Sequence, residues 1–341
     1  MEGHAATSHT PANGTVALQF TGQAGEYFRI WIVNVCLSVV TLGIYSAWAK
    51  VRRKRYFYGN TLLNGAAFDY LADPKAILKG RAIVLAVFVA ISLLGEYLGT
   101  SVFGIVYLVA LPYIVIKASR FNALNSAYRN VRFQFGNGFP PPTGWHRRLA
   151  AGYRETSQFL ILPVFLVPIS LGLMFPYYAW RKRQFFLEHS AYGTTPFSFD
   201  ARPAAFYLAY FKAMLLFLLF LAGSIVTIGV GALPLYILFA SYRDAAVARL
   251  SWSHTRVGNL RFDCQWKTWD LFKLHFLNSL AIILTLGLMA PWAAIRTARY
   301  QLQGLSLGPA GNIEGFVAAA QEQVAATGDE AGELLGFDLG L

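Results

Sequence analysis

Long apolar runs alternate with short polar segments along most of this 341-residue chain. Several of the runs approach the roughly 20 residues that a helix needs to cross a bilayer. The runs are Ile30–Trp48, Ala82–Leu98, Val102–Ala118, Phe159–Tyr178, Phe206–Ile228, Gly231–Ala240 and Phe276–Ile295. Taken alone, this pattern predicts seven helices in a membrane.

Three of the apolar runs contain the same block of sequence. The blocks are TLGIYSAWAKVRRKRY from Thr41, SLGLMFPYYAWRKRQF from Ser170 and TLGLMAPWAAIRTARY from Thr285, aligned without gaps at offsets of 129 and 244 residues. Each block passes from apolar residues through a glycine and an aromatic residue into an arginine-rich segment. That order is typical of a chain that leaves a bilayer.

A second pattern, a short β-hairpin, recurs between the apolar runs. Residues with β propensity surround a turn at Asn64-Gly65 or its counterpart, and alternating aromatic residues follow. The segment Val16–Phe20 resembles the last strand of such a hairpin alone. The strand ends fall at Phe20, Tyr70, Phe135, Phe199 and Cys264, and the last three intervals are 65, 64 and 65 residues.

A fixed period of this kind indicates a repeat architecture of about 65 residues per unit. We expect a disordered lead over residues 1–14, a single membrane domain over 15–311 and an acidic C-terminal tail over 312–341. The expected units of the membrane domain are 20–70, 70–135, 135–199, 199–264 and 264–311.

The number of membrane crossings in each unit must be even if all hairpins lie on one side. The second and fourth units offer two apolar runs each, whereas the other three offer one. A single crossing in those three units would place basic segments such as 181–183 outside, against the positive-inside rule. We therefore predict a mainly α, polytopic membrane protein of same-orientation repeats, with short cytoplasmic β-hairpins and cytoplasmic termini.

In this prediction four helices span the membrane fully and three TLG elements are re-entrant or interfacial. Their turns are expected at Gly43, Gly172 and Gly287, and Pro176 and Pro291 would begin the second limbs. Irregular backbone at membrane depth must be buried in protein or line a wet cavity. Seven ordinary transmembrane helices are the alternative.

Composition supports a membrane class. Hydrophobic residues make up 56% of the chain, charged residues only 13%, and the mean hydropathy is +0.44; soluble domains carry about 25% charged residues. The net charge of +12 is uneven, because all 29 Lys and Arg precede residue 300 and six of the 17 acids follow it. Basic residues flank the apolar runs, which favours anionic phospholipid over nucleic acid as a partner.

The repeated motifs resemble the YjgN-like family of bacterial inner-membrane proteins. The segments that carry the resemblance are EYFRIWIVN (Glu26–Asn34), TLGIYSAWAKVRRKRYFYGNTLLNG (Thr41–Gly65) and RFNALNSAYRNVRFQF (Arg120–Phe135), within a similarity that runs roughly from Gln19 to Leu307. The resemblance implies a multi-pass protein of the bacterial inner membrane. It brings no catalytic residue, because the family has no assigned biochemical function.

Rows of basic residues follow the repeated blocks and form the first candidate site. A ring of these groups would bind lipid phosphates or an anionic solute; alternatively, the side chains fix the topology by snorkelling. The candidates are Lys50, Arg52, Arg53, Arg55, Arg120, Arg181, Arg183, Arg296 and Arg299.

Polar residues inside the apolar runs form the second candidate site, since each is costly in lipid. Asn34 and Asn278 occupy the same repeat position, and Lys212 lies seven residues into the fifth run. These three side chains could line a solute path between units. Alternatively, the asparagines bond between helices and the lysine snorkels.

Signatures of enzymes and metal sites do not occur in the sequence. The six His residues show no HExxH pattern, and neither a GxSxG motif nor a P-loop is present. Cys36 and Cys264 suggest neither a disulfide framework nor a metal site. We expect no cofactor, no metal and no catalytic residue.

The acidic tail leaves two interpretations open. Residues 312–326 have helical propensity and a small apolar stripe, and could dock on a protein partner or on the chain's own basic hairpins. A disordered tail is the simpler alternative.

Two functions follow from these features. The first is an inner-membrane protein that moves or gates a small solute or ion. The second is a non-enzymatic membrane scaffold that binds anionic lipid or a partner such as a membrane protease or envelope protein.

Overall fold

Eleven short antiparallel strands form one sheet in the computed structural model, which describes residues 14–98, 100–136, 154, 156–158, 160–227, 229, 231–309 and 313–322. The strands are β1 (Val16–Ala17), β2 (Gln19–Phe20), β3 (Thr61–Leu63), β4 (Ala66–Tyr70), β5 (Ser126–Tyr128), β6 (Val131–Phe135), β7 (Ser190–Tyr192), β8 (Thr195–Phe199), β9 (Thr255–Val257), β10 (Leu260–Cys264) and β11 (Leu305–Gly308). In the sheet β1 lies beside β11, and the remaining strands follow in descending order from β10 to β2. Only Leu18 separates β1 from β2, so the sheet curls into a barrel whose two ends meet in one segment of chain.

Tight turns join the strands into hairpins. Asn64 and Gly65 have φ of 47° and 74°, and Arg129 and Asn130 have φ of 45° and 66°. Two successive positive φ angles match the right-handed twist of a two-residue hairpin. Each hairpin then pairs with the next in the same register, so that Phe68 faces Tyr128, Phe133 faces Tyr192 and Phe197 faces Val257.

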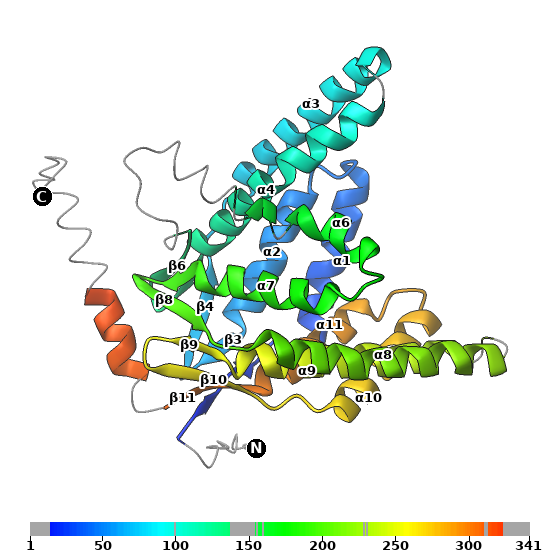
Figure 1. Ribbon diagram of the computed structural model, residues 1–341. Helices are drawn as coiled ribbons and strands as arrows, with labels where there is room; N and C mark the ends of the chain where they lie inside the picture. Colours follow the sequence, from blue (N-terminus) through cyan, green and yellow to red (C-terminus); the bar gives the residue numbers. More distant parts are fainter. Residues whose placement is uncertain are drawn as a thin grey trace, which may run out of the picture.

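Pairs of helices connect one hairpin to the next. They are α1 (Ala24–Val40) with α2 (Ser46–Gly59), α3 (Pro74–Leu98) with α4 (Thr100–Leu124), α6 (Leu162–Ile169) with α7 (Phe175–Glu188), α8 (Pro203–Val226) with α9 (Ala232–Trp252), and α10 (Thr268–Leu284) with α11 (Ala290–Gln303). Each pair leaves an even-numbered strand and returns to the next odd-numbered strand. In an antiparallel barrel this places every pair at the same end, from which the pairs diverge (Figure 1).

The repeated TLG block forms the turn between two helices. Leu42 and Gly43 have φ of 49° and 89°, with nearly identical values at Leu171-Gly172 and Leu286-Gly287. The amide of Gly43 donates to the Ser38 carbonyl (2.7 Å) and that of Leu42 to the Val39 carbonyl (3.1 Å). This pattern is a Schellman motif, which ends the first helix and reverses the chain.

The prediction of a mainly α, polytopic fold with four spans and three re-entrant elements is wrong, and so is the alternative of seven spans. The short hairpins form the central barrel of the molecule instead of an accessory to a helical bundle. Among the described residues, two stretches of helix are long and apolar enough to cross a membrane, namely Pro74–Leu93 and Pro203–Val226. In the three TLG units the apolar run is divided by its turn into two shorter helices.

The physical reason for the error lies in the strands. Each has between two and five residues, which is too short for a strong period-two signal. Their partners lie one repeat away along the chain, so local patterns do not reveal that the hairpins close into one sheet.

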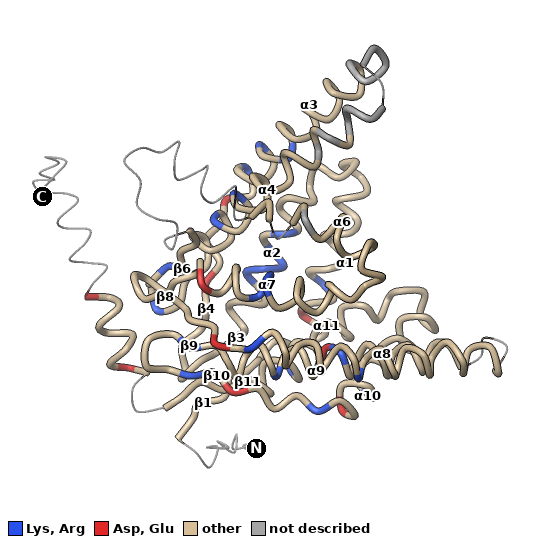
Figure 2. Tube along the Cα trace, viewed as in Figure 1, with Lys and Arg blue, Asp and Glu red and all other residues tan. Residues whose placement is uncertain are grey.

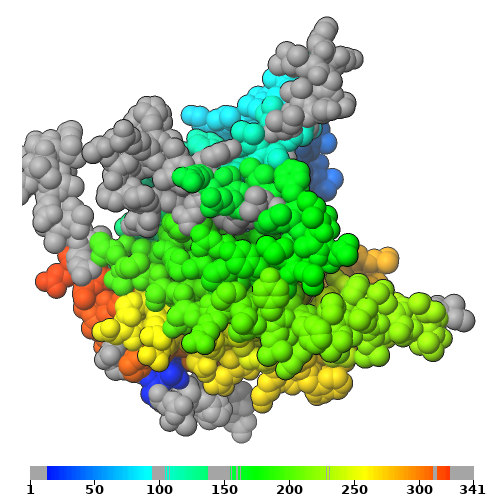
Figure 3. Space-filling model, in the orientation of Figure 1, coloured from blue at the N-terminus to red at the C-terminus, as the bar shows by residue number. Residues whose placement is uncertain are grey.

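A cluster of buried side chains lines the inside of the barrel and continues into a helix beyond β11. Residues such as Tyr128, Tyr192 and Leu260 pack from the strands, while Ile313, Val317 and Ala320 pack from helix 313–322. Figure 3 shows this helix, in orange-red, against one side of the body, with α3 and α8–α9 projecting away from it. The predicted disordered lead and residues 323–341 of the acidic tail lie outside the described residues, apart from Gly14.

Candidate functional site

The ends of the TLG hairpins expose large apolar side chains. Leu42, Leu171 and Leu286 are 95%, 94% and 96% exposed. Apolar neighbours on the same turns are also exposed: Val40, Ile44, Ile169, Leu173, Leu284 and Leu288. We call the turns 40–44, 169–173 and 284–288 the apolar tips. Contiguous exposed apolar side chains of this kind mark an interaction with a membrane or a partner.

The leucine at each tip adopts a backbone conformation that costs energy. The C′ position of a Schellman motif is normally glycine, because a side chain in the left-handed region costs about 1–2 kcal/mol. The fold carries this cost at three equivalent positions. The side chain makes no compensating packing contact at nearly full exposure, so its benefit must come from surroundings outside the chain.

Side-chain hydroxyls satisfy backbone groups at the tips. The Thr41 hydroxyl donates to the Leu37 carbonyl (2.7 Å) and accepts from the Tyr45 amide (2.9 Å). Ser170 and Thr285 accept from the amides of Met174 and Met289, both at 3.1 Å. A turn whose polar groups are paired internally can leave water at low cost.

The α8–α9 connection has the same hydrogen bonds, although it lies outside the three repeated TLG blocks. The Thr227 hydroxyl donates to the Gly223 carbonyl (2.7 Å) and accepts from the Gly231 amide (2.9 Å). Gly229, at φ 85°, donates to the Ser224 carbonyl at 2.7 Å. The sequence contains the pattern that predicts this turn, because Thr227 precedes Gly229 by two residues, as Thr41 precedes Gly43.

The predicted basic residues lie mostly on the helices that return to the barrel. Figure 2 shows Lys and Arg gathered on α2 and α7, whereas the outer parts of α8 and α9 carry no charge. The candidates are distributed as follows: Lys50, Arg52, Arg53 and Arg55 lie on α2, Arg120 lies near the C-terminal end of α4, Arg181 and Arg183 lie on α7, and Arg296 and Arg299 lie on α11.

These basic side chains have different contacts. Arg55 donates to the carbonyls of Tyr70 and Ala72, both at 3.2 Å, and Arg299 donates to that of Gly22 at 3.0 Å. These two arginines tie returning helices to strand ends. Arg52 contacts only the Tyr45 hydroxyl (3.2 Å) among described groups, which leaves its guanidinium largely available to solvent or lipid.

The other basic groups lie closer to their own helices. Arg183 donates to the Ala179 carbonyl (3.1 Å) and lies over the Phe206 ring, 5.9 Å from its centroid. Arg181 donates to Gln184 at 2.8 Å. These basic residues lie on helices of three different pairs, α2, α7 and α11.

The structure does not bring the predicted polar path together. Asn34 and Asn278 are buried in pockets on different sides of α11, which share only Ala290 and Ala294 in their lining. Lys212 is exposed on α8 and lines neither pocket. A path through all three residues would have to cross several packed helices.

One protein family matches nearly the whole chain. The family described as "Bacterial protein of unknown function (DUF898)" matches residues 15–233 and 222–334. The chain belongs to the DUF898 family. No solved structure matches it.

The predicted resemblance to YjgN is also confirmed. The chain is 34% identical over 127 residues to "Inner membrane protein YjgN" of Salmonella typhimurium, covering 36% of this chain and 32% of that protein. It is 35% identical over 124 residues to the protein of the same name from Escherichia coli O157:H7, covering 34% and 30%. The matches thus span about a third of the relatives' length. Their names support placing this DUF898 protein in the inner membrane.

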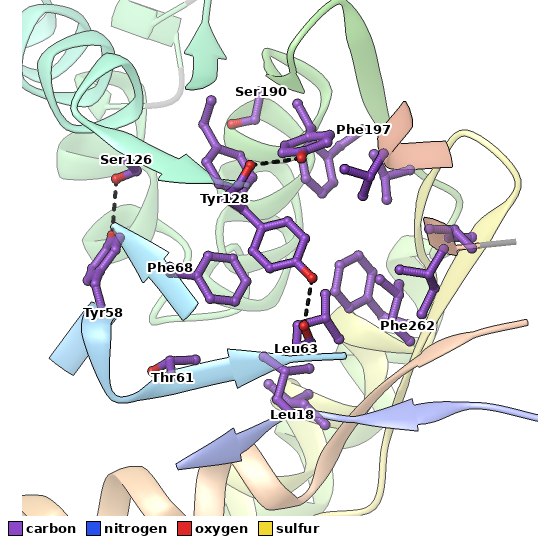
Figure 4. Close-up of a pocket in the computed structure, with 18 of the residues that line it drawn as sticks. Leu18, Tyr58, Thr61, Leu63, Phe68, Ser126, Tyr128, Ser190, Phe197 and Phe262 are labelled. Carbon is purple, nitrogen blue, oxygen red and sulfur yellow. Dashed lines mark hydrogen bonds between the residues drawn. The ribbon is translucent and has the colours of Figure 1, made fainter. Parts of the chain in front are cut away.

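The barrel lumen of this DUF898 protein is an apolar cavity, which the sequence did not predict. Its volume is about 590 Å³, and every hairpin contributes to its lining. Figure 4 shows Phe68, Tyr128, Phe197 and Phe262 pointing inward from their strands. The lining residues come from different repeat units, so the sequence of a single unit does not predict the cavity.

Tyrosine hydroxyls link neighbouring hairpins around the lumen at the repeat spacing. Tyr128 donates to the Leu63 carbonyl (2.6 Å), 65 residues earlier, and Tyr192 donates to the Tyr128 carbonyl (3.0 Å), 64 residues earlier (Figure 4). Burial raises the pKa of both phenols. They therefore stay neutral donors and hold the units in register.

Helix 313–322 closes the turn end of the lumen. Ile313, Phe316 and Val317 line the cavity, and Phe316 stacks on Tyr192 with ring centroids 5.7 Å apart. Gln321 donates to the Arg129 carbonyl at 2.8 Å. Residues 313–322 of the predicted tail therefore dock on the chain's own hairpins, which is one of the interpretations given above.

The described residues contain no group of three or more His, Cys, Asp or Glu that could hold a metal ion. The titratable residues of the lumen are the bonded tyrosines.

Proposed function

We propose that this protein is a non-enzymatic scaffold of the inner membrane that binds anionic phospholipid. The apolar tips insert into the bilayer, and the basic residues on the returning helices face the lipid headgroups. The barrel then lies at the membrane surface, on the cytoplasmic side by the positive-inside rule. The observation that carries the proposal is the recurrence of a strained, nearly fully exposed leucine at three equivalent turns.

The energetics favour insertion over exposure to water. Full burial of a leucine side chain contributes about 1.5–3 kcal/mol, which exceeds the conformational cost at each tip. Each nearby basic group adds about 1 kcal/mol at an anionic surface. Several weak contacts on one rigid body combine into stable anchoring, in addition to any helix that spans the membrane.

Movement of a small solute or ion is the second candidate function. The pocket beside Asn34 favours it, because this pocket contains a buried polar side chain next to apolar residues. The separation of Asn34, Asn278 and Lys212 favours the scaffold. A membrane protease or envelope protein bound to the barrel remains a predicted partner of the scaffold.

Solute flux in proteoliposomes separates the two candidates. For a scaffold, vesicles with the purified full-length protein leak small ions and anions no faster than protein-free vesicles. A flux above that background, reduced in the variants Arg52→Ala, Asn278→Ala or Lys212→Ala, would instead support transport.

A further inference from the structure

A pocket below the first apolar tip combines positive charge with an unpaired polar atom. It lies between α1, α2, the start of α11 and one side chain of α3, with a cavity volume of about 720 Å³. Asn34 and Trp31 line it from α1, Lys50 and Arg53 from α2, and Arg81 from α3. Val35 and Val39 continue the lining toward the tip.

The charge of this pocket is not balanced within the described structure. Its described lining contains three cations and no Asp or Glu. The Arg81 guanidinium donates to the Ser46 hydroxyl, which itself donates to the Gly43 carbonyl of the turn. Arg81 is thereby held beside the tip, and the pocket presents a fixed positive field to an entering anion.

Asn34 supplies the second observation. Its side chain is 92% buried, and its Oδ1 atom has no hydrogen-bond partner among the residues that the structure describes. A buried polar atom without a partner costs about 1–3 kcal/mol. The atom is therefore available to accept a hydrogen bond from a bound group.

The fifth unit provides an internal comparison, because Asn278 occupies the equivalent position. There Oδ1 accepts from Arg296 (3.2 Å) and Nδ2 donates to the Thr297 hydroxyl (3.1 Å). The counterparts of these two residues in the first unit are Arg52, which turns to Tyr45, and Arg53, which lines the pocket. The side-chain amide of Asn278 is thus hydrogen-bonded within its own unit, whereas the Oδ1 atom of Asn34 has no such partner among the described residues.

We propose that this pocket binds a phosphate group that carries a neighbouring hydroxyl, the chemistry of a glycerol phosphate headgroup. Lys50, Arg53 and Arg81 bind the phosphate oxygens through charge-assisted hydrogen bonds. The hydroxyl donates to Asn34 Oδ1, and the apolar side of the pocket faces the attached acyl chains. This site rests on the proposed function, since it places a lipid headgroup directly below an inserted tip.

The test uses the full-length protein in phosphatidylcholine nanodiscs that contain either phosphatidylglycerol or phosphatidylmethanol. The two lipids have the same charge, but only the first has headgroup hydroxyls. Native mass spectrometry counts the retained lipid molecules. We expect tighter retention of phosphatidylglycerol by roughly 3- to 10-fold, the range of one hydrogen bond.

Three variants locate the effect. Asn34→Leu should abolish the preference for phosphatidylglycerol while the protein unfolds at the same or a higher temperature, because an unpaired atom is removed. Arg53→Gln should weaken retention of both anionic lipids about tenfold. Arg261→Gln is the matched control, with the same charge change at an exposed position of strand β10, away from the pocket and from the returning helices, and should change retention less than twofold.

Two outcomes would overturn this site. One is equal retention of the two lipids by the unmodified protein; the other is an equal effect of Arg261→Gln and Arg53→Gln. Either result leaves membrane insertion of the tips intact if they still contact acyl chains, so the site can fail without the scaffold. Displacement of the lipid by soluble glycerol phosphate at similar concentration would support the same chemistry with a free ligand.

Discussion

The leucines at the helix turns have opposite effects on fold stability and on membrane binding. A leucine with positive φ weakens the isolated fold, yet its side chain gains free energy once it leaves water. The glycines at 43, 172 and 287 were predictable as turns, because glycine after an apolar run punctuates a helix. The strained leucine before each glycine was not predictable, since the sequence does not show which residue of the turn takes positive φ.

Glycine at the tips should therefore have opposite effects on two measurements. In the triple variant Leu42→Gly, Leu171→Gly and Leu286→Gly, relief of strain raises the unfolding free energy in detergent by about 1 kcal/mol per site. The same variant should bind vesicles more weakly, because it lacks three apolar side chains. Denaturation in detergent and flotation with vesicles measure the two effects. A loss of stability would mean that these leucines act in the fold.

The two cysteines should differ in reactivity. Cys36 is exposed, whereas Cys264 is buried in β10, where burial raises the pKa of its thiol. A raised pKa keeps the thiol protonated to higher pH, and the thiolate is the reactive form. At pH 8 in detergent, maleimide should modify Cys36 at least tenfold faster, as read by intact mass against the Cys36→Ser variant. Equal rates would show that β10 is accessible to solvent.

At the scale of elements, helix 313–322 stabilises the barrel from its turn end. Its helical propensity was visible in the sequence, but its binding place was not, because it packs against side chains from several units. Ile313 is 1% exposed. Ile313→Ala should lower the unfolding free energy by about 2–5 kcal/mol through loss of apolar burial and a residual cavity.

The control for this prediction is Ala319→Ser, on the exposed side of the same helix. It should change the unfolding free energy by less than about 0.5 kcal/mol. Circular dichroism during denaturation of the full chain in detergent measures both variants. An unchanged midpoint for Ile313→Ala would show that the helix does not pack in the barrel.

At the scale of the whole molecule, the sequence did not predict that the N-terminal segment closes the sheet. Local patterns located the hairpin turn at Asn64-Gly65 and the strand-like segment Val16–Phe20. They could not show that this segment pairs with residues almost 300 positions later. Val16 faces Leu307 across β1 and β11, so the first and the last strand of the chain lie side by side in the barrel.

Cysteine pairing tests this closure. In a chain without Cys36 and Cys264, the double variant Val16→Cys with Leu307→Cys should form an intramolecular disulfide under mild oxidation, because paired strands bring Cα atoms within bridging distance. The pair Val16→Cys with Asp69→Cys, on β1 and β4, should stay reduced. The absence of a bond in the first pair, or equal bonding in both, would contradict the closed sheet.

The most direct test of the central claim measures the depth of the tips in a bilayer. Leu42, Leu171 and Leu286 are replaced singly by cysteine and labelled with an environment-sensitive fluorophore in anionic vesicles with brominated acyl chains. Labels at Asn64 and Asn259, in barrel turns, serve as controls. We predict strong quenching at all three tips and none at the barrel turns. Unquenched tips, or quenching equal to that of the barrel turns, would contradict membrane insertion.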